Sequence, residues 1–179
     1  MAQHRYILAV VVPPEVSDTL AALRDAYGMP PWQPVVPFHI TLVPPFNTAL
    51  PADAVASLVE VVGATPSFPV TLDGFGRFDH ATSILYVDVA NSDALSDLAR
   101  RLRDALSTVT SGHYDEGRFE FTPHVTLTGK APRAVIDRYI ARLANTRFHA
   151  GFTCARFVLM ELDEKVRAWH TLRDFVFTQ

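Results

Sequence analysis

One tetrapeptide pattern, His followed by any residue, Thr and Leu, occurs twice in this chain. The copies are His39-Ile40-Thr41-Leu42 and His124-Val125-Thr126-Leu127. Random order of the same residues would produce two copies in roughly one shuffled chain in 600. Each copy lies in a short predicted strand that is followed by a helical pattern and two more strands. The repeat predicts two copies of a β-α-β-β unit rather than a longer array.

Hydrophobic spacing predicts the elements around the two tetrapeptides. Tyr86 follows His39 by 47 residues and Trp169 follows His124 by 45, so the two units have nearly the same length. We expect one domain over residues 1–179, with pseudo-symmetric lobes of approximately residues 1–90 and 91–179. The predicted strands are 7–12, 39–43, 68–78, 84–89, 119–128, 153–162 and 167–177, and the predicted helices are 16–27, 51–62, 95–109 and 132–143.

Composition excludes several classes of protein. The 179 residues are 49% hydrophobic and 20% charged, which is typical of a globular protein and not of a disordered chain or a coiled coil. A net charge of -3 argues against binding through a wholly basic surface. Cys154 is the single cysteine, and the apolar run 7–12 is too short for a signal peptide or a membrane span. We therefore expect a cytoplasmic monomer with no membrane association and no obligatory protein partner.

The spacing of His and Thr within each copy has a structural meaning. Residues i and i+2 of a strand point to the same face, so each strand presents one imidazole and one hydroxyl while Ile40, Leu42, Val125 and Leu127 face the core. A twofold relation between the lobes would place both pairs around a central cleft. With pKa values near 6.5, one imidazole can accept a proton while the other donates one. These groups could cleave a phosphodiester: the imidazoles would transfer the protons, and the hydroxyls would bind the phosphate oxygens. Such a reaction needs no metal or other cofactor.

The two tetrapeptides resemble the paired signatures of the 2H phosphoesterase superfamily, and in particular its 2',5' RNA ligase or RNA 2',3'-cyclic phosphodiesterase branch. The resemblance covers the whole chain and implies a bilobal α+β fold with antiparallel sheets that flank a central cleft. It also implies metal-independent hydrolysis of RNA 2',3'-cyclic phosphate ends to 2'-phosphates. It makes His39 the proton donor and His124 the acceptor, with Thr41 and Thr126 on the phosphate; the residues alone do not choose between the two histidine roles.

An additional phosphate-binding cation is expected near the second tetrapeptide. Members of this family often carry an arginine just after it, where this chain has Thr128-Gly129-Lys130. Lys130 would act there as a point charge without bidentate geometry, and Arg118 in the preceding loop is another candidate. His80-Ala81-Thr82 shares part of the pattern, but it lies in a predicted turn and is interpreted as solvated.

Four other functions are compatible with the sequence. The same chemistry would serve a 2',5'-phosphodiesterase or a phosphodiesterase of small cyclic nucleotides, because the tetrapeptides address phosphate and not base. A nucleotide-binding or RNA-end-binding module without catalysis is the alternative from another class. RNA joining would have to proceed by reversal of the cleavage chemistry, because the chain has no nucleotidyl-transfer lysine motif. The partners expected from all these functions are RNA ends or small cyclic nucleotides.

Overall fold

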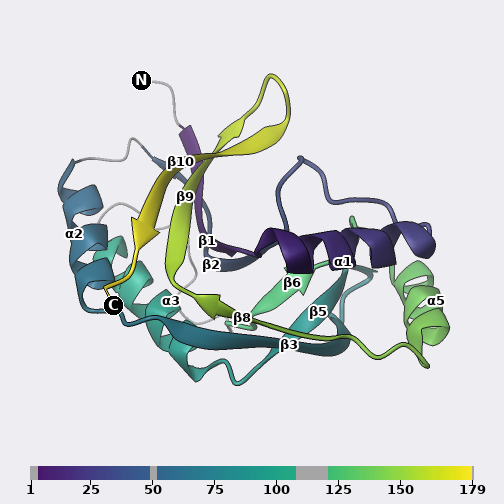
Figure 1. Ribbon diagram of the computed structural model, residues 1–179. Coiled ribbons are helices and arrows are strands. Elements are labelled where there is room, and N and C mark those ends of the chain that lie inside the picture. Colours follow the sequence, from purple (N-terminus) through teal and green to yellow (C-terminus); the bar gives the residue numbers. More distant parts are fainter. Residues whose placement is uncertain (1–3, 49–51, 108–120, 179) are drawn as a thin grey trace.

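A computed structural model describes residues 4–48, 52–107 and 121–178. Its main feature is one eight-stranded sheet with the order β10-β9-β1-β2-β6-β5-β3-β8, in which all neighbours are antiparallel (Figure 1). Two very short strands, β4 and β7, pair separately. The strands are β1 (His4–Val11), β2 (His39–Thr48), β3 (Phe68–Arg77), β4 (Thr82–Ser83), β5 (Leu85–Ala90), β6 (His124–Thr126), β7 (Ala131–Pro132), β8 (His149–Cys154), β9 (Arg156–Asp163) and β10 (Ala168–Val176).

The sheet consists of two four-stranded halves that meet at the tetrapeptide strands. β2 and β6 are joined through the pair Ile40 and Val125, and three further strands follow on each side. The expected α+β class with antiparallel sheets is therefore confirmed, and the two sheets are continuous through this pair. One half takes its strands from the two ends of the chain, because β9 and β10 lie beside β1 and β2, whereas the other half takes β3, β5, β6 and β8 from the middle.

In the described part of the chain, four helices cover the sheet and contribute to one hydrophobic core. They are α1 (Pro14–Ala26), α2 (Ala52–Gly63), α3 (Asp93–Ala105) and α5 (Arg133–Leu143). α2 and α3 pack together at one end of the molecule, and α5 lies at the other end (Figure 1). The core includes one fully buried side chain from each helix, in chain order Leu20, Leu58, Leu98 and Ile136.

Strand boundaries differ from the sequence prediction where long-range pairing decides them. β2 does not end at Pro44-Pro45 but continues to Thr48, because a bulge against β1 accommodates the two prolines, which lack an N–H group. The predicted strand 153–162 is in fact two strands that are separated at Ala155. The chain crosses there from β8, which pairs with β3, to β9, which pairs with β1.

A proline-rich segment, residues 29–37, joins the two halves of the sheet; we call it the proline strap. At one end, the Gly129 N–H donates to the Pro30 carbonyl at 2.8 Å, just beyond β6. At the other end, the Val35 N–H donates to Arg167 O at 2.9 Å, and the Trp169 N–H donates to Val35 O at 2.8 Å. The strap therefore bridges the motif strand β6 and the β9–β10 hairpin, and it passes beside the tetrapeptides.

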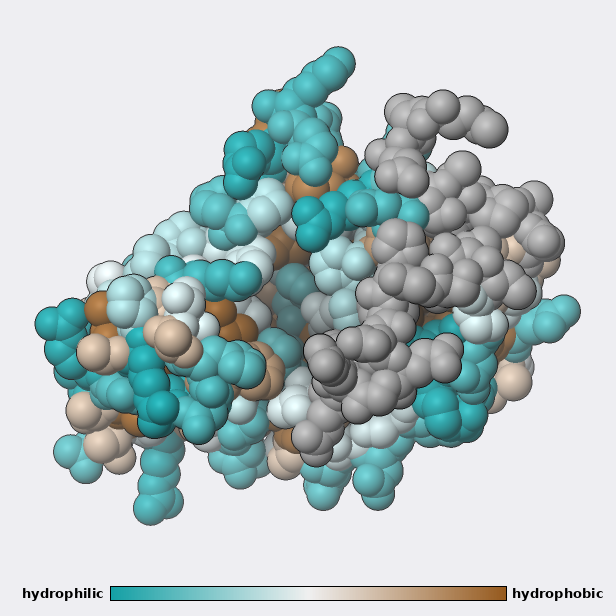
Figure 2. All heavy atoms as spheres, turned by 180° about the vertical axis from the view of Figure 1, so that it is seen from behind, coloured by the Kyte–Doolittle hydropathy of each residue, from teal (hydrophilic) through white to brown (hydrophobic). Residues whose placement is uncertain are grey.

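Most of the described surface on the face opposite to Figure 1 is hydrophilic, with apolar atoms in small separate groups (Figure 2). Among the described helices, none combines the length and the apolar character that crossing a bilayer requires.

Candidate active site

The structure brings the two tetrapeptides together at the centre of the sheet. His39 and Thr41 on β2 and His124 and Thr126 on β6 all line one pocket of about 450 Å³. The alternate residues, Ile40, Leu42, Val125 and Leu127, are buried in the core. The period-two prediction for both strands is thus confirmed, and the pairing of β2 with β6 explains why the two His-Thr pairs share one space.

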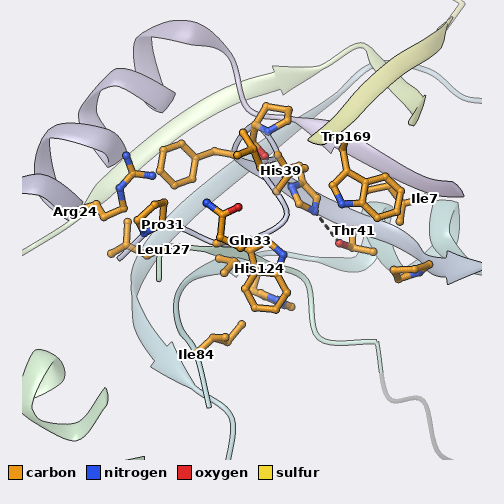
Figure 3. A pocket seen from close by; sticks show the side chains of 17 residues that line it. Ile7, Arg24, Pro31, Gln33, His39, Thr41, Ile84, His124, Leu127 and Trp169 are labelled. Carbon is orange, nitrogen blue, oxygen red and sulfur yellow. Dashed lines mark hydrogen bonds between the residues drawn. The ribbon is translucent and has the colours of Figure 1, made fainter. Parts of the chain in front are cut away.

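Each histidine is held by the same backbone contact. His39 donates from Nδ1 to the Pro37 carbonyl at 2.8 Å, and His124 donates from Nδ1 to the Thr122 carbonyl at 2.7 Å. A carbonyl can only accept, so Nδ1 carries a proton in both rings and Nε2 is left for a ligand. His39 Nε2 lies 3.1 Å from Thr41 Oγ1. The dashed line between these two side chains in Figure 3 marks this contact. Both Nε2 atoms can therefore take up or release a proton, and that of His39 also has Thr41 Oγ1 as a hydrogen-bond partner.

Aromatic rings fix His124 from one side. The ring centroids of Phe78 and Tyr86 both lie 5.0 Å from that of His124, with Phe78 in an edge arrangement. Gly76 makes this possible, because a Cβ at that position would lie 2.4 Å from Tyr86 Cε2. The close packing restricts the rotation of the imidazole.

Burial lowers the pKa of both histidines below the ordinary value, because the cationic form loses its hydration. For His39, the hydrogen bond to the Pro37 carbonyl raises the pKa, and the charge of a protonated His124 lowers it further. For His124, the Thr122 carbonyl and the carboxylate of Asp88 both oppose the effect of burial on the pKa. The two rings are thus coupled, and binding of the first proton disfavours the second.

The cations around the pocket differ from those predicted. Arg118 lies outside the described residues. Lys130 is exposed and does not line the pocket, but its Nζ lies 5.7 Å from the ring centroid of Trp32, which does. Arg24 of α1, which the sequence analysis did not identify, lines the pocket with its Cζ 5.4 Å above the ring of Phe38.

The pocket has two chemically different ends (Figure 3). His39 and Thr41 lie near Trp169 and Ile7 at one end, and Arg24 lies at the other. Gln33 of the proline strap points into the space between them. No sequence pattern could have found Arg24 or Gln33, because α1 and the strap reach the pocket only through tertiary contacts.

The remaining candidates from the sequence take secondary positions. His80 is exposed and stacks on Phe78 with a centroid separation of 6.4 Å, outside the pocket lining. Tyr86 and Trp169 follow the two tetrapeptides at nearly equal distances in the sequence, but they lie at different places in the sheet, because β5 lies beside β6 whereas β10 is an edge strand. Trp169 lines the pocket, and Tyr86 supports His124 from outside the lining.

The described residues offer no cluster of three or more His, Cys, Asp or Glu side chains that could hold a metal ion. Cys154 is buried, and burial raises the pKa of its thiol to about 12, so it is not a reactive thiolate at neutral pH.

Two curated bacterial proteins are similar in sequence, and both are named "Putative phosphoesterase". The one from Bacillus cereus (strain G9842) is 29% identical over 159 residues, which is 86% of this chain and 87% of the relative. The one from Geobacillus thermodenitrificans (strain NG80-2) is 27% identical over 128 residues, which is 70% of each chain.

Two solved structures share the fold. The protein TT0787 of Thermus thermophilus superimposes on this chain with a TM-score of 0.72 at 22% identity. The superposition covers 97% of each of the two chains. LigT of E. coli, in complex with 3'-AMP, superimposes with a TM-score of 0.70 at 21% identity, over 99% of this chain and 100% of LigT. The sequence profile of the 2'-5' RNA ligase superfamily matches residues 12–166. This match confirms the resemblance found in the tetrapeptides: the chain belongs to the 2'-5' RNA ligase superfamily of the 2H phosphoesterases.

Proposed function

We propose that this phosphoesterase hydrolyses the 2',3'-cyclic phosphate at RNA ends to a 2'-phosphate, without a metal ion, by general acid–base catalysis with His39 and His124. The observation that carries the proposal is the pair of imidazoles in one pocket. Each ring is fixed by a hydrogen bond from Nδ1, and the two strands that carry the rings are paired with each other. One Nε2 accepts a proton from water while the oxygen of that water attacks phosphorus. The other Nε2 donates its proton to the 3' oxygen as the P–O3' bond breaks.

The two threonines complete the site for an anion. Each hydroxyl lies two residues after its histidine, on the same strand face and in the same pocket. The Thr41 hydroxyl donates to His39 Nε2 while that ring is neutral, and it can donate to a non-bridging phosphate oxygen when Nε2 is protonated. Arg24 adds a permanent positive charge at the other end of the pocket, and Lys130 adds one beside Trp32. The E. coli LigT structure with 3'-AMP supports the choice of a nucleotide substrate, since that protein has the same fold.

The proposal is tested by incubating a short 5'-labelled RNA that ends in a 2',3'-cyclic phosphate with the protein in EDTA. We expect a 2'-phosphate product, and losses of about 10² to 10⁴ in rate for both His39→Ala and His124→Ala. His149→Ala is the matched control, because His149 is exposed on β8 and does not line the pocket. A folded wild-type protein that leaves the cyclic phosphate intact, or His39→Ala and His124→Ala variants as active as the His149→Ala control, would refute the proposal.

The same assay separates the alternative substrates. A 2',5'-linked oligonucleotide and a cyclic mononucleotide are run beside the RNA, and the ratios of kcat/KM rank them. Tight binding of a mononucleotide with no turnover of any of the three would identify a binding module instead of an enzyme.

A further inference from the structure

The pocket can bind an anion at each of its two ends. The imidazoles and hydroxyls of the two tetrapeptides lie on β2 and β6, and Arg24 of α1 lies at the opposite end from His39 and Thr41 (Figure 3). Among the described residues that line the pocket, Arg24 is the only arginine or lysine, and none is an aspartate or a glutamate. The lining therefore carries a permanent positive charge with no acidic side chain to neutralise it, which favours a ligand with a negative group at this end.

The guanidinium of Arg24 has few partners within the protein. Its side chain is 22% exposed, and Nε donates to Asp25 Oδ1 at 3.3 Å. The side chain of Asp25 is 71% exposed and does not line the pocket. In the described ranges of the chain, Nη1 and Nη2 of Arg24 make no hydrogen bond and no ion pair. These two groups carry most of the N–H donors of the side chain, so the donors are left for a ligand.

A ring contact fixes the position of Arg24 relative to the first tetrapeptide. The Cζ atom of Arg24 lies 5.4 Å from the ring centroid of Phe38. The Phe38 carbonyl accepts a hydrogen bond from the Val12 N–H at 2.9 Å, which ties this residue to the end of β1. Phe38 directly precedes His39, and the Cα atoms of consecutive residues are about 3.8 Å apart. The cation and the imidazole are therefore held by neighbouring residues of the same strand.

The space between the two ends suits a nucleotide. The pocket volume of about 450 Å³ lies within the range of about 300–1,000 Å³ that is usual for a whole small-molecule ligand. Gln33 points into this space, where its amide can bind a ligand that joins the two ends (Figure 3). The last nucleotide of an RNA with a 2',3'-cyclic phosphate has a second phosphate on its 5' oxygen. The two phosphates leave the ribose on opposite sides, as the two ends of the pocket require.

Arg142 shows what a purely structural arginine looks like in the same fold. Both arginines lie in the last turn of a helix, where a cation interacts favourably with the helix dipole. Both also lie over an aromatic ring, with Arg142 Cζ 5.1 Å from the ring centroid of Tyr27. Arg142 Nη1, however, donates to the Tyr27 carbonyl at 3.1 Å, and Arg142 does not line the pocket. The dipole and the ring contact therefore do not explain the inward position and the unpaired donors of Arg24.

We propose that Arg24 forms a second anion subsite, which binds the phosphate on the 5' oxygen of the nucleotide whose cyclic phosphate lies at the histidines. The cyclic phosphate rests on the proposed function, whereas the subsite rests on the pocket. In RNA this second phosphate is the link to the preceding nucleotide, and in a mononucleotide it is a terminal 5'-phosphate. A nucleoside 2',3'-cyclic phosphate has neither. Arg24 thus favours RNA ends and 5'-phosphorylated mononucleotides over simple nucleoside cyclic phosphates.

The first test measures binding and needs no turnover. Isothermal titration calorimetry in EDTA compares adenosine 2'-phosphate with adenosine 2',5'-bisphosphate, which differ only in the 5'-phosphate. We expect the wild type to bind the bisphosphate about tenfold more tightly, near the lower end of what a hydrogen bond to a charged group contributes. Arg24→Gln removes the charge at similar length and should bring the two dissociation constants together. Arg142→Gln makes the same change in the net charge and should keep the tenfold difference.

The second test changes the substrate. A dinucleotide that ends in a 2',3'-cyclic phosphate is prepared with a phosphodiester linkage and with a neutral methylphosphonate linkage. We expect kcat/KM of the wild type to be about tenfold higher for the phosphodiester, mainly through KM, because Arg24 lies remote from the reacting phosphate. The ratio should fall to near one in Arg24→Gln and persist in Arg142→Gln. A 5'-phosphorylated nucleoside 2',3'-cyclic phosphate, run beside them, distinguishes a terminal phosphate from the RNA linkage.

The outcomes separate this proposal from the proposed function. Equal affinity of the wild type for the two adenosine phosphates, no binding of either, or the same difference in Arg24→Gln as in Arg142→Gln would overturn the proposal. A difference that is lost in Lys130→Gln and kept in Arg24→Gln would assign the 5'-phosphate to Lys130 and overturn it as well. Failure of the wild type to hydrolyse any cyclic phosphate would refute the proposed function, whereas an affinity difference that depends on Arg24 would still support the subsite.

Discussion

Replacing Gly76 with alanine should disturb His124 through the ring of Tyr86. The new Cβ would lie 2.4 Å from Tyr86 Cε2 and 2.7 Å from Cζ, whereas ordinary contact begins near 3.4 Å. The ring must therefore move by about 1 Å. It is 8% exposed and is packed against Phe78, at a centroid distance of 4.9 Å, and against His124. The space into which Tyr86 can move is thus the space of the candidate catalytic imidazole.

The expected cost in the free energy of unfolding is about 1–3 kcal/mol for overpacking. The lower conformational entropy of the unfolded alanine chain offsets about 0.4–1 kcal/mol of this. Urea denaturation should show a net destabilisation of about 0–2.6 kcal/mol, centred near about 1.3 kcal/mol. Hydrolysis of the cyclic phosphate should fall by about 10²-fold, the loss typical of a 1 Å misplacement at a reacting group.

Gly63→Ala is the matched control, because a Cβ at the end of α2 would meet nothing within 4 Å. The mechanism is tested by a double-mutant cycle with Tyr86→Leu, which removes the ring atoms that collide. We expect Gly76→Ala to cost at least about 1 kcal/mol less in the Tyr86→Leu background. Equal stability and activity of Gly76→Ala and Gly63→Ala, or additive costs in the cycle, would refute the reasoning.

Three further predictions concern the strap, the cation and pH. Gly129→Ala places a Cβ 2.8 Å from the Pro31 carbonyl, so the strap should shift and KM should rise more than kcat falls; an unchanged KM in steady-state kinetics would contradict this. Arg24→Ala should lower kcat/KM about tenfold and weaken its salt dependence, with Arg142→Ala on α5 as control; equal salt dependence in Arg24→Ala and the wild type would contradict a role in anion binding. Burial lowers the folded-state pKa of both histidines, so the unfolded chain binds more protons, and the free energy of unfolding should fall as pH drops below about 6.5. In urea titrations, the free energy of unfolding of the double variant His39→Asn/His124→Asn should fall less over this pH range than that of the wild type. An equal fall would contradict the assignment of this pH dependence to the two histidines.

Local periodicity was sufficient to predict the centre of the site. Alternation within β2 and β6 places His and Thr on one face whatever the rest of the chain does, and the repeat of the tetrapeptide indicated that the two faces meet. The helices were predicted for the same reason, because their buried apolar residues recur at helical spacing.

What the sequence could not predict depends on contacts between distant segments. Arg24 is one arginine among several on predicted helices, and it lines the pocket through a tertiary contact with the ring of Phe38. In the sequence, Asp88 is one polar residue in an ordinary strand pattern. Only the register of β5 against β6 shows that it lies opposite His124. The division of residues 153–162 into two strands likewise follows from their different partners and not from their own residues.

The central claim is that two coupled imidazoles perform both proton transfers. The most direct measurement is the pH dependence of kcat/KM for RNA ending in a 2',3'-cyclic phosphate, in EDTA, for the wild type and for each single histidine variant. The account predicts a bell-shaped profile for the wild type, and the loss of one limb in each of His39→Ala and His124→Ala. A flat wild-type profile, or a bell that survives in either variant, would contradict it.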